Sequence, residues 1–171
     1  WEEAGILSFL VTQNIDGLHR EAGSRKVAEF HGSVSELVCQ RCGARVPAGP
    51  EALAAGLLAE LPPRCAAPGS GGRPCGGVLK PDFVFFGEAI PHEAYEAAFD
   101  AAARADACLV IGSTGVVYPA AEVPLVVARS GGKVIVVDPG ETEFSEIASV
   151  QVRLGAVDAM RELDVLVRGA A

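Results

Sequence analysis

Short apolar runs alternate along the chain with stretches of mixed polarity, and glycine or polar residues follow each run. The runs at 6–12, 107–112 and 133–138 are continuous and rich in β-branched residues, which predicts buried strands. Further patterns predict a short strand or turn at 27–31, an apolar strand at 79–88 and a weaker strand at 150–154. Helices are predicted at 51–61, 91–105, 119–129 and 156–167. This alternation indicates an α/β fold, a Rossmann-like parallel sheet with helices on both faces.

One segment departs from this pattern. Between 38 and 78 the chain is rich in Cys, Gly, Pro and Ala, which predicts a small inserted module with little core of its own. The stretch at 66–74 is a flexible loop by composition. We therefore expect a first Rossmann-like part at 1–37, the module at 38–78 and a second Rossmann-like part at 79–171.

Four of the five cysteines lie in this module, at Cys39, Cys42, Cys65 and Cys75. Clustered cysteines favour a metal site over disulfides, and four thiolates enclose a structural zinc in the manner of a zinc ribbon. The Cys39–Cys42 spacing is typical of such a site, whereas Cys65 and Cys75 are further apart than usual. Gly and Pro in the intervening loop allow it to close. The alternative is a set of free or redox-active thiols.

Composition excludes several classes of protein. The 171 residues are 50% hydrophobic, which suits roughly one packed domain and excludes intrinsic disorder. No apolar run of about 18 residues and no signal-peptide pattern is present, so we expect no membrane partner and a cytoplasmic location. The net charge of −8 argues against direct nucleic-acid binding. It fits a soluble surface or basic partners.

Polar residues follow three of the predicted strands. They are found at 13–16, at 112–114 and at 138–140. In open α/β sheets, ligands bind outside the carboxyl ends of strands, and an acidic residue such as Asp138 accepts hydrogen bonds from ribose hydroxyls. The pattern points to a dinucleotide, and the alternative is ordinary loop chemistry.

Histidine is the residue type best suited to general base catalysis near neutral pH. The chain has three, His19, His31 and His92. His92 is expected at the surface because it lies at a predicted helix start among polar residues. The local sequence does not rank His19 against His31.

Several longer motifs resemble the sirtuin family, most closely its bacterial and archaeal members. They are TQNIDGLH at 12–19, AGS at 22–24, HGS at 31–33, the Cys39–Cys42 pair, LKPD at 79–82, VFFGE at 84–88 and VYPAA at 117–121. They occur in the family's order over nearly the whole chain. The resemblance implies an NAD-dependent protein lysine deacylase that releases nicotinamide, free lysine and O-acyl-ADP-ribose.

The resemblance also implies roles for individual residues near the first predicted strand. His31 would be the general base that deprotonates a ribose hydroxyl, after the acyl oxygen attacks the anomeric carbon and nicotinamide leaves. A neutral imidazole in a water-poor pocket suits this step. Gln13 and Asn14 would hold the ribose, with Asn14 taking part in catalysis. Ile15 and Asp16 would face the nicotinamide amide.

Other groups follow from the same resemblance. Phosphate and ribose would be received by Gly112, Ser113 and Thr114, and the rest of NAD would contact Asp138, Pro139, Gly140 and Ala156. The acylated lysine of a protein substrate would dock by edge pairing along Val84, Phe85, Gly87 and Glu88, with Val116. The four cysteines would hold a structural Zn²⁺ remote from the chemistry.

This chain departs from the family pattern at several positions. Family members usually carry Gly-Thr-Ser or Gly-Ser-Ser at 112–114, followed by Leu, where this chain has Gly-Ser-Thr and Gly115. Asp138 stands where many members have Asn, and the Cys65–Cys75 spacing is widened. The first strand of the family fold and its Gly-Ala-Gly phosphate loop are also missing, because Trp1 lies well inside the pattern.

Two other functions remain open from the sequence. One is NAD-dependent ADP-ribosyl transfer to protein, and the other is a non-catalytic, zinc-stapled module that binds peptides. A hydride-transferring dehydrogenase is disfavoured because no Gly-x-Gly-x-x-Gly loop is present.

We predict that these 171 residues alone bind NAD poorly and do not turn over. The reason is the missing phosphate-binding turn, which supplies backbone N–H groups to the pyrophosphate in dinucleotide sites. The measurement is NAD-dependent deacylation of an acyl-lysine peptide by the purified chain. Robust activity that a His31→Ala variant lacks would contradict this prediction.

Overall fold

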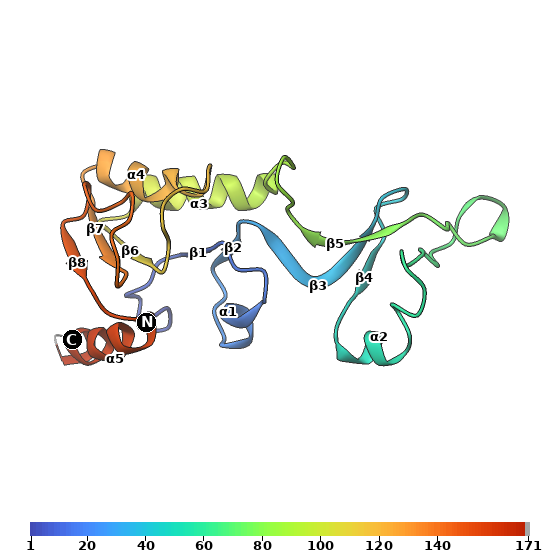
Figure 1. The fold of residues 1–171 in the computed structure, drawn as a ribbon, viewed down its shortest axis with the longest axis horizontal. Coiled ribbons are helices and arrows are strands. Elements are labelled where there is room, and N and C mark those ends of the chain that lie inside the picture. The colour runs from blue at the N-terminus through green and yellow to red at the C-terminus, as the bar shows by residue number, and fades with distance from the viewer. Residues whose placement is uncertain (170–171) are drawn as a thin grey trace. The chain divides into compact units, whose positions relative to one another are not determined.

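The computed structural model describes residues 1–169 and divides the chain into two compact units, the first from Trp1 to Tyr95 and the second from Glu96 onward (Figure 1). The first unit contains a two-stranded parallel sheet and the cysteine-rich module. The second contains a three-stranded parallel sheet with its helices.

The first unit begins with the parallel pair β1 (Leu10–Thr12) and β2 (Val27–Glu29), connected through the short helix α1 (Leu18–Glu21). Strand β1 is shorter than the predicted 6–12. The N–H groups of Ile6 and Leu7 instead donate to the Trp1 carbonyl, at 2.9 and 3.1 Å. A turn at the start of the chain therefore replaces the first part of the expected strand.

The module is built on an antiparallel sheet of order β4-β3-β5. Its strands are β3 (Gly32–Cys39), β4 (Arg45–Pro47) and β5 (Leu79–Phe83). The sequence did not predict β3 or β4, and β5 ends earlier than the expected strand at 79–88. The predicted helix at 51–61 is reduced to α2 (Pro50–Ala54), and Gly56 beyond it has a positive φ of 87° that ends helical geometry. The 3₁₀ helix η1 (Ser70–Gly72) lies in the predicted loop.

The second unit follows the predicted alternation of strands and helices. After α3 (His92–Arg104), which crosses the unit boundary, come β6 (Ala107–Ile111), α4 (Glu122–Arg129), β7 (Lys133–Val137), β8 (Val150–Val152) and α5 (Ala156–Gly169). All three strands are parallel, in the order β6-β7-β8. Helix α4 packs against β6 and β7. It begins three residues later than predicted because a turn is closed by hydrogen bonds to the Val117 and Pro119 carbonyls.

The apolar core of the second unit confirms that β6 and β7 are its central strands. Val134 and Val136 of β7 are each 1% exposed and pack with Val110, Ala121 and Phe144. Burial of such side chains is the main favourable contribution to folding. The Rossmann-like α/β class with an inserted cysteine module is thus confirmed. The parallel strands lie in two sheets, β1-β2 and β6-β7-β8, where the sequence pattern suggested one. No described helix is long and apolar enough to span a membrane.

Candidate functional site

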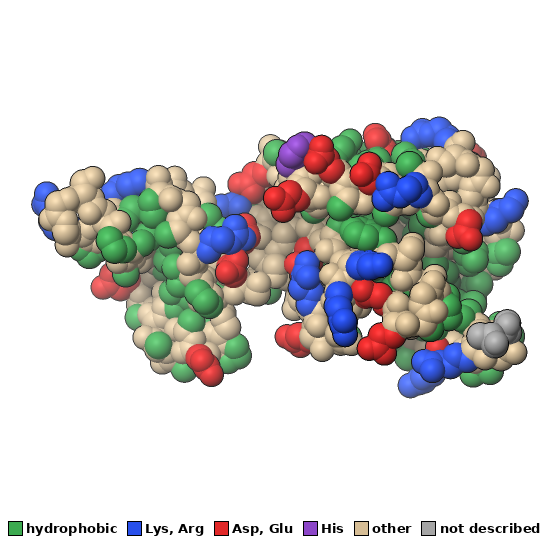
Figure 2. Space-filling view, turned by 180° about the vertical axis from the view of Figure 1, so that it is seen from behind, with side chains coloured by type: hydrophobic (Ala, Val, Ile, Leu, Met, Phe, Trp, Pro, Cys, Tyr) green, Lys and Arg blue, Asp and Glu red, His purple; other side chains and the backbone are tan. Residues whose placement is uncertain are grey.

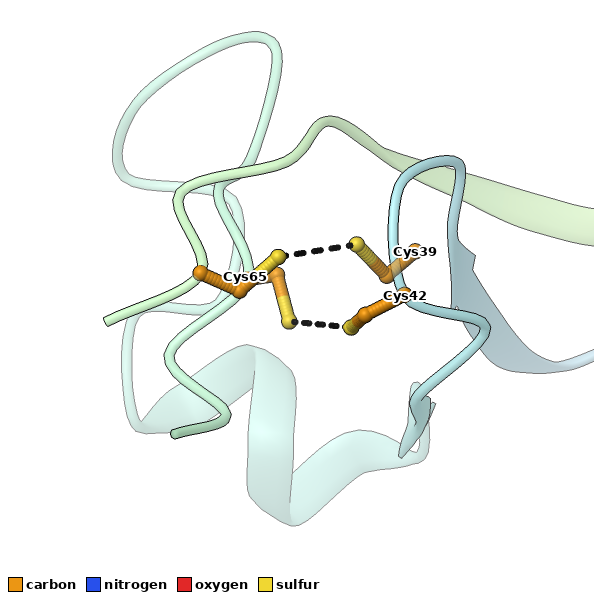
Figure 3. Close-up of side chains that lie close together, drawn as sticks. Cys39, Cys42 and Cys65 are labelled. Carbon is orange, nitrogen blue, oxygen red and sulfur yellow. Dashed lines mark hydrogen bonds between the residues drawn. The ribbon is translucent and has the colours of Figure 1, made fainter. Parts of the chain in front are cut away.

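The four cysteines of the module come together at one point. Cys39 ends β3, Cys42 follows in the turn to β4, and Cys65 and Cys75 belong to the segment before β5. Their sulfur atoms all lie within 4.8 Å of one another. Figure 3 shows the labelled side chains of Cys39, Cys42 and Cys65 pointing toward a common centre.

The sulfur spacing fits zinc. A tetrahedral ion with Zn–S bonds of about 2.3 Å requires sulfurs about 3.8 Å apart. The Cys39–Cys75 and Cys42–Cys65 Sγ pairs are each 3.8 Å apart. Disulfide sulfurs lie about 2 Å apart, so these cysteines are not oxidised pairs. The wide Cys65–Cys75 spacing closes because the Cys75 N–H donates to the Ala67 carbonyl and the Gly76 N–H to the Cys65 carbonyl.

The surroundings of the cysteines shift the pKa values of two of their thiols. Backbone N–H groups of Cys42 and Arg41 lower the pKa of the Cys39 thiol to about 6, the latter at 3.4 Å from Sγ. Cys39 is therefore a thiolate at neutral pH, the form that ligates metal. The pKa of Cys75 is raised: the Gly77 N–H lowers it, but burial and the neighbouring sulfurs outweigh that effect. Burial and the neighbouring sulfurs therefore disfavour the charged form of Cys75.

We predict that Gly77→Ala weakens zinc binding by roughly tenfold or more, the usual scale when residues that position metal ligands are changed. A Cβ at position 77 would lie 2.6 Å from Cys39 Sγ and 2.7 Å from Arg41 Cβ, so the ligand must move. Gly49→Ala in the same module is the matched control, because its Cβ meets nothing within 4 Å. Zinc content and chelator competition measure the effect, and equal affinities in the two variants would contradict it.

His31 lies just beyond β2, between two fixed neighbours. Phe30 before it is fully buried, and its N–H donates to the Thr12 carbonyl at 2.8 Å, extending the β1-β2 pairing. Gly32 after it has a φ of 74°, and a Cβ there would clash with the Asp82 carbonyl and lie 2.9 Å from Phe83 Cα. The His31 backbone is therefore held from both sides.

The His31 side chain contacts the segment that follows β1. Its Nδ1 is 3.2 Å from the Gln13 carbonyl oxygen. A carbonyl can only accept, so Nδ1 carries the proton and Nε2 is left as the basic nitrogen. The ring is half-buried and packs edge-on to Phe30 at 5.9 Å. This long-range contact ranks His31 above His19, a choice that the local sequence left undecided.

The other residues predicted at this strand end lie beside the same contact. The Val34 N–H donates to the Ile15 carbonyl at 2.9 Å, which joins the loop after β1 to β3. Asn14 and Asp16 are exposed. In their loop the Asn14 N–H donates to Thr12 Oγ1, and the Leu18 N–H donates to Asp16 Oδ1. The structure thus brings the 13–16 segment and His31 together in the first unit.

The predicted peptide-docking segment is directly attached to His31. The Val84 N–H donates to the His31 carbonyl at 2.9 Å. Beyond it, the Glu88 N–H donates to the Phe85 carbonyl at 2.9 Å, which closes a turn with Gly87 at a φ of 89°. Phe85 and Phe86 are 47% and 99% exposed. Two apolar rings of the segment that follows β5 therefore face solvent.

The remaining predicted residues lie in the second unit, at the carboxyl edge of β6-β7-β8. Ile111 pairs with Val137, and Val137 pairs with Val152, so the segments that follow these strands are neighbours. They are 112–114 after β6, 138–140 after β7, and the turn into α5 at Ala156. Gly112 has a φ of 59°, and the Gly140 N–H donates to Asp138 Oδ1 at 2.8 Å. Val116 is exposed.

Gly115, a departure from the family pattern, has a structural explanation. A Cβ there would lie 2.9 Å from Glu143 Cβ and 3.1 Å from the Phe144 ring, and φ is 83°. The Glu143 N–H also donates to the Thr114 carbonyl at 3.0 Å. The segment after β7 therefore packs directly on the 112–115 loop and fixes it.

We predict that Gly115→Ala lowers the free energy of unfolding of the chain by about 1–3 kcal/mol, because the buried Phe144 ring and the positive φ both oppose a side chain. Gly155→Ala, whose Cβ meets nothing within 4 Å, should stay within about 0.5 kcal/mol of wild type. Urea unfolding measures both. A Gly115→Ala variant as stable as Gly155→Ala would refute the packing argument.

Sequence reasoning missed one residue of this region, Lys80. Its ammonium contacts the docking segment, yet a lone lysine within a strand attracts no attention in the sequence. The LKPD motif at 79–82 was the only signal that could have singled it out.

Comparison with known proteins agrees with the class that this fold and site define, an α/β protein with a zinc module. The Sir2 family model matches residues 1–119, and the chain belongs to the Sir2 family. An NAD-dependent protein deacylase of Thermococcus kodakarensis is 44% identical over 163 residues, which cover 95% of this chain and 61% of the relative. An NAD-dependent protein deacetylase of Thermotoga maritima is 40% identical over 162 residues, covering 95% and 62%.

Solved structures give the same result. A Sir2 structure with a p53 peptide and NAD+ is similar with a TM-score of 0.86 at 40% identity, covering 99% of this chain and 66% of that one. A Sir2 bound to a propionylated peptide is similar with the same TM-score and identity. The chain spans about three fifths of the length of the curated relatives it matches.

Proposed function

We propose that this chain carries the general base, the peptide dock, part of the NAD site and the structural zinc of an NAD-dependent protein lysine deacylase. The contact between His31 Nδ1 and the Gln13 carbonyl carries this proposal. In the neutral ring it leaves Nε2 as the proton acceptor, and the imidazole lies beside the segment expected to hold the ribose. Named relatives with deacylase activity and solved complexes with NAD+ and acylated peptides support it.

In the proposed reaction, the residues of this chain bind NAD and move one proton. NAD, when bound, supplies the sugar carbon that accepts the acyl oxygen as nicotinamide leaves. Gln13 and Asn14 orient the ribose, and Ile15 and Asp16 hold the nicotinamide amide. His31 then takes a proton from a ribose hydroxyl onto Nε2, while the Gln13 carbonyl fixes the tautomer through Nδ1. The strand ends at 112–114 and 138–140, with Ala156, receive the remainder of NAD.

The acyl-lysine peptide is held by edge pairing on Val84, Phe85, Gly87 and Glu88. The Val84 N–H is hydrogen-bonded to the His31 carbonyl, so the peptide-docking segment and the general base are held by the same backbone contact. The bound lysine therefore arrives at a set distance from the base. Exposed Phe85 gives the peptide an apolar surface to cover.

Zinc has a structural role in this proposal. Strand β3 runs from Gly32 to Cys39, so the metal lies roughly 20 Å along the strand from the residue next to His31. Four cysteine ligands also leave no open position for substrate. Reduced cysteines at metal-ligand spacing favour a reducing compartment such as the cytoplasm. Figure 2 shows acidic and basic side chains interspersed on the face in view, which offers nucleic acid no continuous basic surface there.

The test is a chimera in which the N-terminal part of the Thermotoga maritima relative, which this chain does not cover, precedes residue 1. We expect NAD-dependent release of nicotinamide and of free lysine from an acetylated peptide. His31→Ala should lower kcat about 100-fold or more, the scale of general base catalysis, with peptide binding retained.

His92→Ala is the matched control, since His92 is exposed and stands at the start of α3. It should leave kcat unchanged. The proposal fails if the chimera binds peptide but does not deacylate it, if His31→Ala is as active as His92→Ala, or if ADP-ribose is transferred to protein while the acyl group stays in place.

A further inference from the structure

The Lys80 ammonium lies at the centre of a small network on β5. It donates to the Phe83 carbonyl at 2.8 Å and to the Pro81 carbonyl at 3.3 Å. It pairs with the Glu88 carboxylate at 2.9 Å and lies 4.7 Å from the centre of the Phe85 ring. Only 24% of its side chain is exposed, so partners within the protein replace much of its water.

Three of these partners, Phe83, Phe85 and Glu88, lie in one continuous segment that runs from the last residue of β5 to the end of the following turn. The Glu88 carboxylate also accepts the Phe85 N–H at 3.0 Å, so it holds both the turn and Lys80. The Phe85 N–H and the Lys80 charge lower the pKa of Glu88, in that order. Without Lys80, Glu88 would lose its ion pair, and the turn would lose this connection to β5.

The same segment is joined to the catalytic side of the unit by the pairing of Phe83 with Gly32 and by a link from the Val84 N–H to the His31 carbonyl. Val84 lies between Phe83 and Phe85, the two residues that Lys80 contacts through a carbonyl and a ring. Lys80 therefore fixes the segment on both sides of that link. It touches neither His31 nor the 13–16 loop among the contacts described above.

We propose that Lys80 is a positioning residue for substrate, which sets the conformation of the 83–88 segment so that it can pair with an acyl-lysine peptide. This inference rests on the proposed function, since it assigns a task within the peptide dock. Pre-ordering a docking strand lowers the entropy lost when the peptide binds, so it acts on peptide affinity. Lys80 should not affect NAD binding or proton transfer.

An ordinary surface ion pair is a different case, and the same sheet provides one. Arg45 of β4 pairs with Glu36 and Asp82, and its side chain is 54% exposed. Such pairs contribute little because water competes for both partners. Lys80 differs in its burial, in donating to two backbone carbonyls and in lying over a ring.

The experiment uses the chimera described above with Lys80→Met, which keeps the apolar stem and removes the charge. We expect the KM for the acetylated peptide to rise about tenfold, the scale for loss of charged hydrogen bonds, with kcat and the KM for NAD within about twofold. Lys80→Arg should restore most of the peptide affinity. Lys133→Met, an exposed lysine at the start of β7, is the matched control and should behave as wild type.

A second measurement needs no activity. In the 171-residue chain, hydrogen exchange at the Phe85 and Glu88 amides, read by NMR, should accelerate about tenfold in Lys80→Met and not in Lys133→Met. Amides in β7 serve as an internal reference for global stability.

The outcomes separate the two proposals. A wild-type chimera without deacylation overturns the proposed function, and the exchange measurement then still decides whether Lys80 orders the turn. An active chimera whose peptide KM is unchanged by Lys80→Met overturns this inference alone. Equal losses in kcat, NAD affinity and peptide affinity, with β7 amides also accelerated, would show a purely structural role and overturn it as well.

Discussion

The close approach of Gly32 to the backbone of β5 is the constraint on which the candidate site depends. At this point β3 begins, and the chain must pass within contact distance of Asp82 and Phe83. Only a residue without a side chain fits, and its positive φ redirects the chain. The turn places the His31 carbonyl on Val84 and its ring on Gln13. His31, the 13–16 loop and the segment that begins at Val84 are thereby held together within the first unit.

Local pattern was sufficient where one element buries a continuous apolar face. Strands β6 and β7 and helices α3 and α5 lie close to their predicted bounds, because their sequences alternate clearly between buried runs and amphipathic periods. The local pattern failed for β3, a strand of the module sheet whose residues include two serines and a glutamate. There the structure depends on pairing with β4 and β5, which no local window contains.

The site residues show the same division. The four cysteines were predicted as metal ligands from the sequence, because residue type and spacing identify thiolate ligands. His31 could be ranked above His19 only by contact with Gln13, 18 positions away. Lys80 was missed for a related reason: its importance lies in which carbonyls and rings it meets after folding. Gly115 illustrates the reverse case, where an unusual residue is explained by the Phe144 ring that occupies its space.

The small size of the β1-β2 sheet links the order around His31 to metal binding in the module. A sheet of two short strands is marginally stable by itself, so order around His31 relies on β3 and β5 beside it. The far end of β3 terminates in Cys39, one of the zinc ligands. Withdrawal of the ion would free that end and lower the cost of local opening along the strand. Loss of a metal at Cys39 would therefore loosen the strand whose other end lies next to His31.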